Sequence, residues 1–259
     1  MIGLREVASE CAGTALLLFG GLSAVAFSLS ENSPLGSLFP NEIMRRLIAS
    51  VLFAAIATLI IYSPLGKISG GHINPAITIT FTGLGKLSLF GAAAYVASQF
   101  TGAIAGAAVA QIAWGRRLDD INAGSTRPEY GGVWFALAAE MLATSLMLWV
   151  IVSFVKRGRL APYTPVAAGI VIAIVAFFSA PFYGASMNPA RSLGPAIIGG
   201  VWGGLWVYFV APSIAALVVV SLNRYRIIPC AKLIHDPAYS CPFKNCLISQ
   251  KARAGDVSV

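Results

Sequence analysis

Six long apolar stretches restrict what this chain can fold into. A helix needs about 20 mainly apolar residues to cross the hydrocarbon core of a bilayer, and each stretch is of about that length. Only 11% of the 259 residues are charged, whereas a soluble domain has roughly 25%. The sequence therefore predicts an all-α polytopic membrane protein with six transmembrane helices. We expect these helices at residues 6–29, 45–63, 86–113, 131–155, 163–182 and 202–222.

Two further apolar segments, residues 74–84 and 188–198, are too short to cross. About eleven helical residues rise about 16 Å, roughly half of a hydrocarbon core of about 30 Å. Asn is a favourable helix N-cap, and Pro suits the first helical position. We predict two re-entrant half-helices that enter from opposite faces and together form a seventh crossing. Their starts are Asn74, Pro75 and Ala76, and Asn188, Pro189 and Ala190.

The two halves of the chain repeat the same order of features. A Glu-x-x-x-Thr motif begins at Glu10 in the first stretch and recurs at Glu140 in the fourth. Each half then has two more stretches, with one Asn-Pro-Ala segment between them. Because each half has an odd number of crossings, the second half is inverted relative to the first. We expect a membrane domain over residues 1–222, with repeat halves at about 1–115 and 128–222.

The distribution of Lys and Arg predicts the orientation. Most of the 18 such residues fall on the side that carries both termini, and basic loops stay in the cytoplasm. We therefore expect a multi-pass protein of the plasma or inner membrane with both termini cytoplasmic. The net charge of +8 is spread over loops and tail, so the expected partner is the lipid bilayer and not nucleic acid.

The residues before each Asn-Pro-Ala segment are expected to line a pore. If each Asn oxygen caps its half-helix, the amide NH₂ is free to point into the lumen. Exposed backbone carbonyls at membrane depth are tolerated only where they line a polar cavity. The residues expected to line the pore are Gly70, Gly71, His72, Ile73, Gly184, Ser186 and Met187. His72 has pH sensing as an alternative role.

A pore of this kind favours water or another small neutral solute. The positive ends of the two half-helices repel cations and protons, and an ion would find no carboxylate to offset its desolvation. We expect a passive channel, not an enzyme, without a cofactor. A wider solute channel is the main alternative. A secondary transporter and a non-conducting structural protein are the others.

Four polar residues of the membrane segments have predicted roles. Glu10 and Glu140 are interpreted as acceptors that hold the re-entrant loops, with a proton relay as the alternative. Gln99 is expected to bond to a re-entrant loop. Arg191 follows Asn188 by three residues, so both lie on one face of the half-helix. We expect its cation to face the outer mouth of the pore.

The segments His72 to Ala76 and Met187 to Ser192, with the paired Glu-x-x-x-Thr motifs, resemble the aquaporin (major intrinsic protein) family. The resemblance covers about residues 4–222. It implies a right-handed bundle, a pore in every subunit, a homotetramer and passive flux. A bacterial source is also expected.

The resemblance also implies a selectivity ring nearer the outer face. Carried over by spacing, its members are Leu52, Ala176, Ala185 and Arg191, with Phe53 as the alternative to Leu52. Water channels of the family usually have an aromatic residue in the second span and a histidine in the fifth. With Leu52 and Ala176 at those positions, a wider and less polar ring is expected.

Two other positions favour water. Glycerol channels of the family usually have an aspartate directly after the arginine and a basic residue four positions further on. Here those residues are Ser192 and Ala196. We expect water to pass, together with some ammonia, hydrogen peroxide, metalloid hydroxide or glycerol.

The tail, residues 223–259, contains three of the four cysteines and a histidine. A Cys₃His zinc set is chemically possible, although the spacing is not one of the tight pairs usual for such sites. A cytoplasmic tail with free thiols and no metal is the other interpretation. The candidate ligands are Cys230, His235, Cys241 and Cys246.

Overall fold

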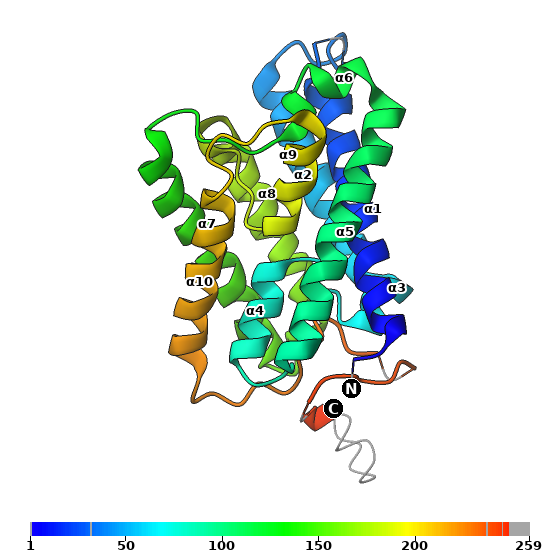
Figure 1. The fold of residues 1–259 in the computed structure, drawn as a ribbon, viewed down its shortest axis with the longest axis vertical. Coiled ribbons are helices and arrows are strands. Elements are labelled where there is room, and N and C mark those ends of the chain that lie inside the picture. Colours follow the sequence, from blue (N-terminus) through cyan, green and yellow to red (C-terminus); the bar gives the residue numbers. More distant parts are fainter. Residues whose placement is uncertain (1, 32, 237, 245, 249–259) are drawn as a thin grey trace.

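The computed structural model describes residues 2–31, 33–236, 238–244 and 246–248, and these residues form helices and loops without strands (Figure 1). Residues 249–259, the end of the predicted tail, lie outside the described residues. Each predicted apolar stretch coincides with one long helix, which confirms the fold class. The long helices are α1 (Leu4–Leu29), α2 (Glu42–Tyr62), α5 (Leu89–Trp114), α7 (Gly132–Val155), α8 (Thr164–Tyr183) and α10 (Val207–Asn223).

The long helices have the length and apolarity of membrane spans. Five of them, all except α10, are long and apolar enough to cross a bilayer. α10 has 17 residues and begins at Val207 rather than near residue 202, because residues 203–206 form turns and Gly204 adopts a φ of 74°. Large apolar side chains on the outside of the bundle, such as Leu59 and Ile112, are 67% and 85% exposed. Such a surface requires lipid around it.

The two re-entrant segments form half-helices, α4 (Pro75–Gly83) and α9 (Pro189–Gly199). Asn74 and Asn188 are the N-caps, and a proline occupies the first helical turn of each. α4 packs against α10, and α9 packs against α5. A short helix, α3 (Pro64–Ser69), follows the second span, and its N-cap is Ser63.

Two glycines of α5 allow the backbones of α1 and α5 to touch. A Cβ atom on Gly102 would lie 2.2 Å from the carbonyl oxygen of Cys11, and one on Gly106 would lie 2.1 Å from that of Ala15. Both distances are impossible for real atoms, so these positions require glycine. The small residues therefore allow close helix packing inside the membrane, where packing and hydrogen bonds replace the hydrophobic effect.

Gly106→Ala should therefore destabilise the bundle by forcing α5 away from α1. We expect a lower midpoint of thermal unfolding in detergent and a lower yield of monodisperse protein. Gly158→Ala is the matched control, because a Cβ atom there meets nothing within 4 Å and the residue has no positive φ. Equal midpoints for the two variants would contradict the close contact.

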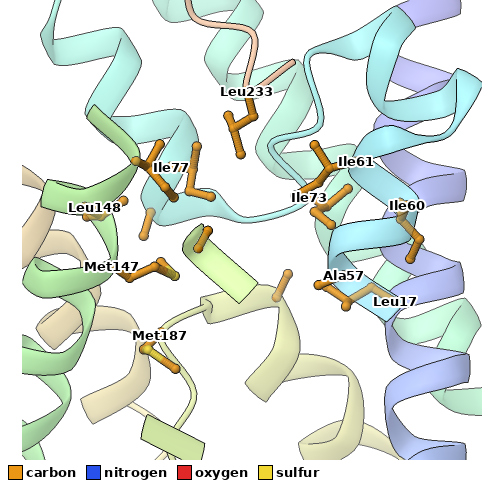
Figure 2. Packing of buried hydrophobic residues seen from close by; sticks show 14 of the residues in the cluster. Leu17, Ala57, Ile60, Ile61, Ile73, Ile77, Met147, Leu148, Met187 and Leu233 are labelled. Carbon is orange, nitrogen blue, oxygen red and sulfur yellow. The ribbon is translucent and has the colours of Figure 1, made fainter. Parts of the chain in front are cut away.

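The core of the bundle surrounds the starts of the half-helices. Figure 2 shows buried apolar side chains from α1, α2, α7 and both re-entrant segments directed toward the same central region. One of them, Leu233, comes from the tail. The tail lies at the same end of the molecule as the N-terminus (Figure 1). It therefore belongs to the packed structure, which the sequence did not indicate.

Candidate functional site: the paired half-helix starts

The starts of α4 and α9 meet through two Asn side chains. Nδ2 of Asn74 donates a hydrogen bond of 2.8 Å to the carbonyl of Met187, and Nδ2 of Asn188 donates one of 3.0 Å to the carbonyl of Ile73. Each side-chain oxygen caps its own half-helix. The expectation that the whole amide is free is therefore wrong. One of its two hydrogens is used by the opposite loop, and at most one remains for a solute.

Both loops adopt a left-handed backbone immediately before the Asn. The φ angle is 41° at Ile73 and 53° at Met187, and Ala185 and Gly184 also have positive φ. A left-handed conformation is uncommon for a residue with a side chain, especially a β-branched one, and costs about 1–3 kcal/mol. The surrounding structure must therefore hold these loops in place.

Glu10 holds the first loop. Its Oε1 accepts hydrogen bonds from the backbone N–H of His72 (3.0 Å) and the hydroxyl of Ser69 (2.7 Å). Its Oε2 accepts from the backbone N–H of Ile73 (2.6 Å) and from Nε2 of Gln99 (2.7 Å). The side chain is fully buried. These partners belong to the end of α3, to the first loop and to α5, so the carboxylate fixes the loop against the bundle.

Glu140 has the same position in the second half. It is fully buried and accepts hydrogen bonds from the backbone N–H of Ser186 (3.1 Å) and of Met187. The structure therefore brings both predicted carboxylates to the loops that precede the Asn residues.

Two tyrosines that the sequence analysis missed also hold the loops. The hydroxyl of Tyr95 donates to the carbonyl of Ser69 (2.7 Å), and that of Tyr208 donates to the carbonyl of Tyr183 (2.5 Å). Tyr95 lies in the third span and Tyr208 in the sixth, so they are related by the repeat. A tyrosine in the last span of each half was the signal that could have found them.

His72 does not lie free in a lumen. Its side chain is 0% exposed. Nδ1 is 3.1 Å from Oγ1 of Thr78, and Nε2 is 3.0 Å from the carbonyl oxygen of Ala231 in the tail. The ring stacks on Phe81 and on Phe243 of the tail, each at 5.4 Å between centroids. The predicted pore-lining histidine is thus covered by the tail.

Arg191 lies against Phe53. Its guanidinium carbon is 5.6 Å from the centroid of the Phe53 ring, and Nη1 donates a 2.7 Å hydrogen bond to the carbonyl of Gly124. Leu52 is 38% exposed. It lies on the same face of α2 as Leu59, about 100° around the helix from Phe53. The alternative, Phe53, is therefore the second-span residue beside the arginine.

The other ring candidates are small residues of the second half. Ala185 is buried in the loop before Asn188, and Ala176 is half-buried on α8. Ser192 has a neighbour that the sequence did not indicate. Its hydroxyl lies 2.7 Å from the Thr126 hydroxyl, in the connection between α6 (Arg116–Asp119) and α7. That connection also supplies Gly124, the partner of Arg191. The segment between the repeat halves therefore helps to build the side of the site that holds Arg191.

The candidate metal ligands of the tail come together in space. The donor atoms of Cys230, His235, Cys241 and Cys246 all lie within 4.8 Å of one another. Sγ of Cys230 is 3.3 Å from Sγ of Cys241, and Sγ of Cys246 is 3.5 Å from Nε2 of His235. This cluster is the group of residues in the described chain that could hold a metal ion.

Known proteins share both the sequence pattern and the fold. The Nodulin-26 of Glycine max is 30% identical over 86% of this chain and 79% of its own length. The Aquaporin NIP1-1 of Arabidopsis thaliana is 32% identical over 83% of this chain and 71% of its own length. The solved aquaglyceroporin from Plasmodium falciparum superposes with a TM-score of 0.73 at 20% identity, covering 89% of this chain and 99% of that one.

The curated relatives named above are plant proteins, so the expectation of a bacterial source is not supported. The family model described as "Major intrinsic protein" matches residues 2–222, which are nearly all of the chain before the tail. The paired half-helices with their Asn caps lie inside this range. The chain therefore belongs to the major intrinsic protein family.

Proposed function

We propose that this protein is a passive channel that conducts water and other small neutral solutes and excludes ions. The observation that carries the proposal is the meeting of Asn74 and Asn188 at the starts of two opposed half-helices. Each helix start carries about half a positive charge. A water whose oxygen accepts from both amides turns its hydrogens away along the pore, which interrupts a proton wire. The same positive ends repel cations.

The carboxylates of the spans support a channel over an ion-coupled transporter. Glu10 and Glu140 are fully buried, and both accept hydrogen bonds from backbone N–H groups of the loops. A secondary transporter needs an ion or substrate site at the midplane. Neither carboxylate is available for one, and the same contacts argue against a proton relay.

The selectivity ring combines two large side chains with two small ones. We assign it to Phe53, Ala176, Ala185 and Arg191, because Phe53 lies against the guanidinium. The aromatic residue narrows the ring relative to Leu52, and Ala176 leaves room where water channels of the family have a histidine. Water is the main solute, with ammonia, hydrogen peroxide, a metalloid hydroxide or glycerol beside it. The alternative is a wider solute channel in which water is a secondary solute, and the two small alanine side chains support it.

Osmotic flux into proteoliposomes tests the proposal. Stopped-flow light scattering should show fast water flux that depends weakly on temperature and not at all on ion gradients. Gradients of glycerol and methylamine would then rank the other solutes. Flux that requires an ion gradient would favour a transporter, and the absence of any flux would favour a structural role.

Ala176→His should narrow the ring and add polar nitrogen atoms to it. Water flux is expected to persist, whereas glycerol and methylamine flux should fall by about an order of magnitude, because a neutral solute larger than water loses the space beside Arg191. Ala173→His, on α8 but lining the groove toward α2, is the control. Equal solute profiles for the two variants would show that Ala176 does not face the pore.

Assembly and orientation complete the proposal. The protein is a homotetramer with a pore in each subunit, as its family membership favours, and it lies in a plasma or inner membrane with both termini cytoplasmic. The tail-side mouth of the pore is then the cytoplasmic one. Native mass spectrometry of the detergent-solubilised protein measures the first property, and protease access to the tail in sealed vesicles measures the second.

A further inference from the structure

The described part of the tail is mostly irregular. After α10 ends at Asn223, its described residues form turns, bends and irregular segments, apart from residues 247 and 248, which are helical. Even so, Ile228, Leu233 and Phe243 are buried. A segment this short cannot build an independent hydrophobic core, and such segments are usually stabilised by a metal or by cross-links.

Its three thiols and one imidazole have the composition of a closed zinc site, and their donor atoms lie at distances that suit one. Zinc in a tetrahedral site is bound at about 2.3 Å by sulfur and about 2.0 Å by nitrogen, which places the ligand atoms about 3.5–3.8 Å apart. The donor atoms here are within 4.8 Å of one another, and two of the pairs are at 3.3 and 3.5 Å. Four protein ligands leave no open position, which is typical of a structural site.

Lys232 provides an independent sign of negative charge at this place. Its side chain is only 3% exposed, and the ammonium donates to the carbonyls of Lys67 and Ser240 (3.0 Å for the latter). Its backbone N–H points at Sγ of Cys230, 3.4 Å away. Three thiolates and one Zn²⁺ have a net charge of −1. A buried cation beside that charge is compensated, whereas beside three neutral thiols it has only carbonyl partners.

The segment that holds the cluster covers the first re-entrant loop. The backbone N–H of Leu233 donates to the carbonyl of Gly70 (3.0 Å), and the carbonyl of Ala231 lies against His72. These two loop residues were expected to line the pore. The Phe243 ring stacks on His72 with an interplanar angle of 18°. The tail therefore occupies hydrogen-bonding and stacking positions on two residues that were expected to line the pore.

Two further contacts attach the tail segment to α3 and to the loop after α4. Lys67, on α3, forms a 3.0 Å ion pair with Asp236, next to the candidate ligand His235. The backbone N–H of Lys244 donates to the carbonyl of Lys86 (3.0 Å). The cluster thus lies between attachment points on α3 and on the loop after α4.

We propose that Cys230, His235, Cys241 and Cys246 bind one Zn²⁺ ion, and that this metal holds the tail over the tail-side mouth of the pore and restricts flux. The second part rests on the proposed channel function. A reducing cytoplasm keeps the thiols available for metal and disfavours a disulfide between them. Loss of the metal would release the segment from the loop, and water flux would rise.

Metal content tests the first part without any flux measurement. Full-length protein purified without chelators should contain about one zinc per chain, and its cobalt form should show thiolate-to-cobalt absorption. Cys241→Ser should lose both signals. Cys11→Ser, which removes the one cysteine outside the tail, should keep them. A metal-free wild-type protein, or one with a Cys230–Cys241 disulfide, would overturn the site.

Flux in proteoliposomes tests the second part. Cys241→Ser and chelator treatment should each raise water flux several-fold, and Cys11→Ser should not. Phe243→Ala tests the contact between tail and loop separately from metal binding, because it removes the stacking on His72 and leaves all four ligands. It should keep its zinc and conduct faster than the wild type.

Unchanged flux after zinc loss, in vesicles where wild-type protein conducts, would overturn the restriction of flux. If zinc binds but neither wild type nor variants conduct, the channel proposal fails, the restriction of flux fails with it, and the metal site stands.

Discussion

Glu10→Ala should prevent the first re-entrant loop from keeping its conformation. The substitution removes the acceptor of two buried backbone N–H groups, those of His72 and Ile73. Each unpaired buried donor costs about 1–3 kcal/mol, and Ile73 also has a strained backbone. We expect a large drop in the midpoint of thermal unfolding and loss of water flux from the protein that still inserts.

Glu10→Gln separates shape from acceptor capacity. Glutamine keeps the volume of the side chain and one oxygen. With its amide nitrogen in the place of Oε2, it cannot accept the hydrogen bonds from Ile73 and Gln99. Its thermal midpoint should therefore lie between those of wild type and alanine variant. Glu42→Gln, on the exposed start of α2, is the control and should behave as wild type. Wild-type stability and flux of Glu10→Ala would contradict the role of Glu10.

The fold was predictable because its signals are local and periodic. The lengths of the apolar stretches predict the six spans. The Asn-Pro pair at the start of each half-helix marks where the preceding loop ends and the helix begins. The repeated order of Glu10 and Glu140 predicts the inversion. The late start of α10 was not predictable from hydropathy, because Trp202 and Leu205 are apolar although they precede the helix.

The choice between Leu52 and Phe53 depends on a difference of one residue. Successive residues of a helix point about 100° apart, so a one-residue error in spacing moves the assignment to another face. The spacing carried over from the family left Leu52 and its neighbour Phe53 as alternatives. The contact of Phe53 with Arg191 favours Phe53.

The tail and the Asn amides depend on tertiary contacts. The described tail has no periodic pattern, so nothing in the sequence indicated that Phe243 stacks on His72. The order of its cysteines allowed a zinc set, and only the folded chain brings the four donor atoms together. In the same way, the bond from Asn74 to Met187 joins residues that are 113 positions apart.

Arg191→Val should allow cations through the outer part of the pore. A unit charge about 5 Å from a permeating cation raises its energy by about 3 kcal/mol at an effective dielectric constant of about 20. That energy corresponds to roughly a 100-fold change in rate. We expect proton and cation leak to rise by up to this factor, and glycerol flux to rise because the side chain is smaller. A pH-sensitive dye inside proteoliposomes measures the proton leak.

Arg191→Lys distinguishes the charge from the geometry of the guanidinium. Lysine keeps the cation, so the leak should stay low, but it cannot repeat the flat contact with Phe53 and the bond to Gly124 together. Solute selectivity should therefore change while ion exclusion persists. Arg117→Val, an exposed arginine of α6 (Arg116–Asp119), is the control for lost surface charge. If Arg191→Val leaks no more than Arg117→Val, the barrier to ions lies at Asn74 and Asn188, and the two half-helix ends are sufficient for it.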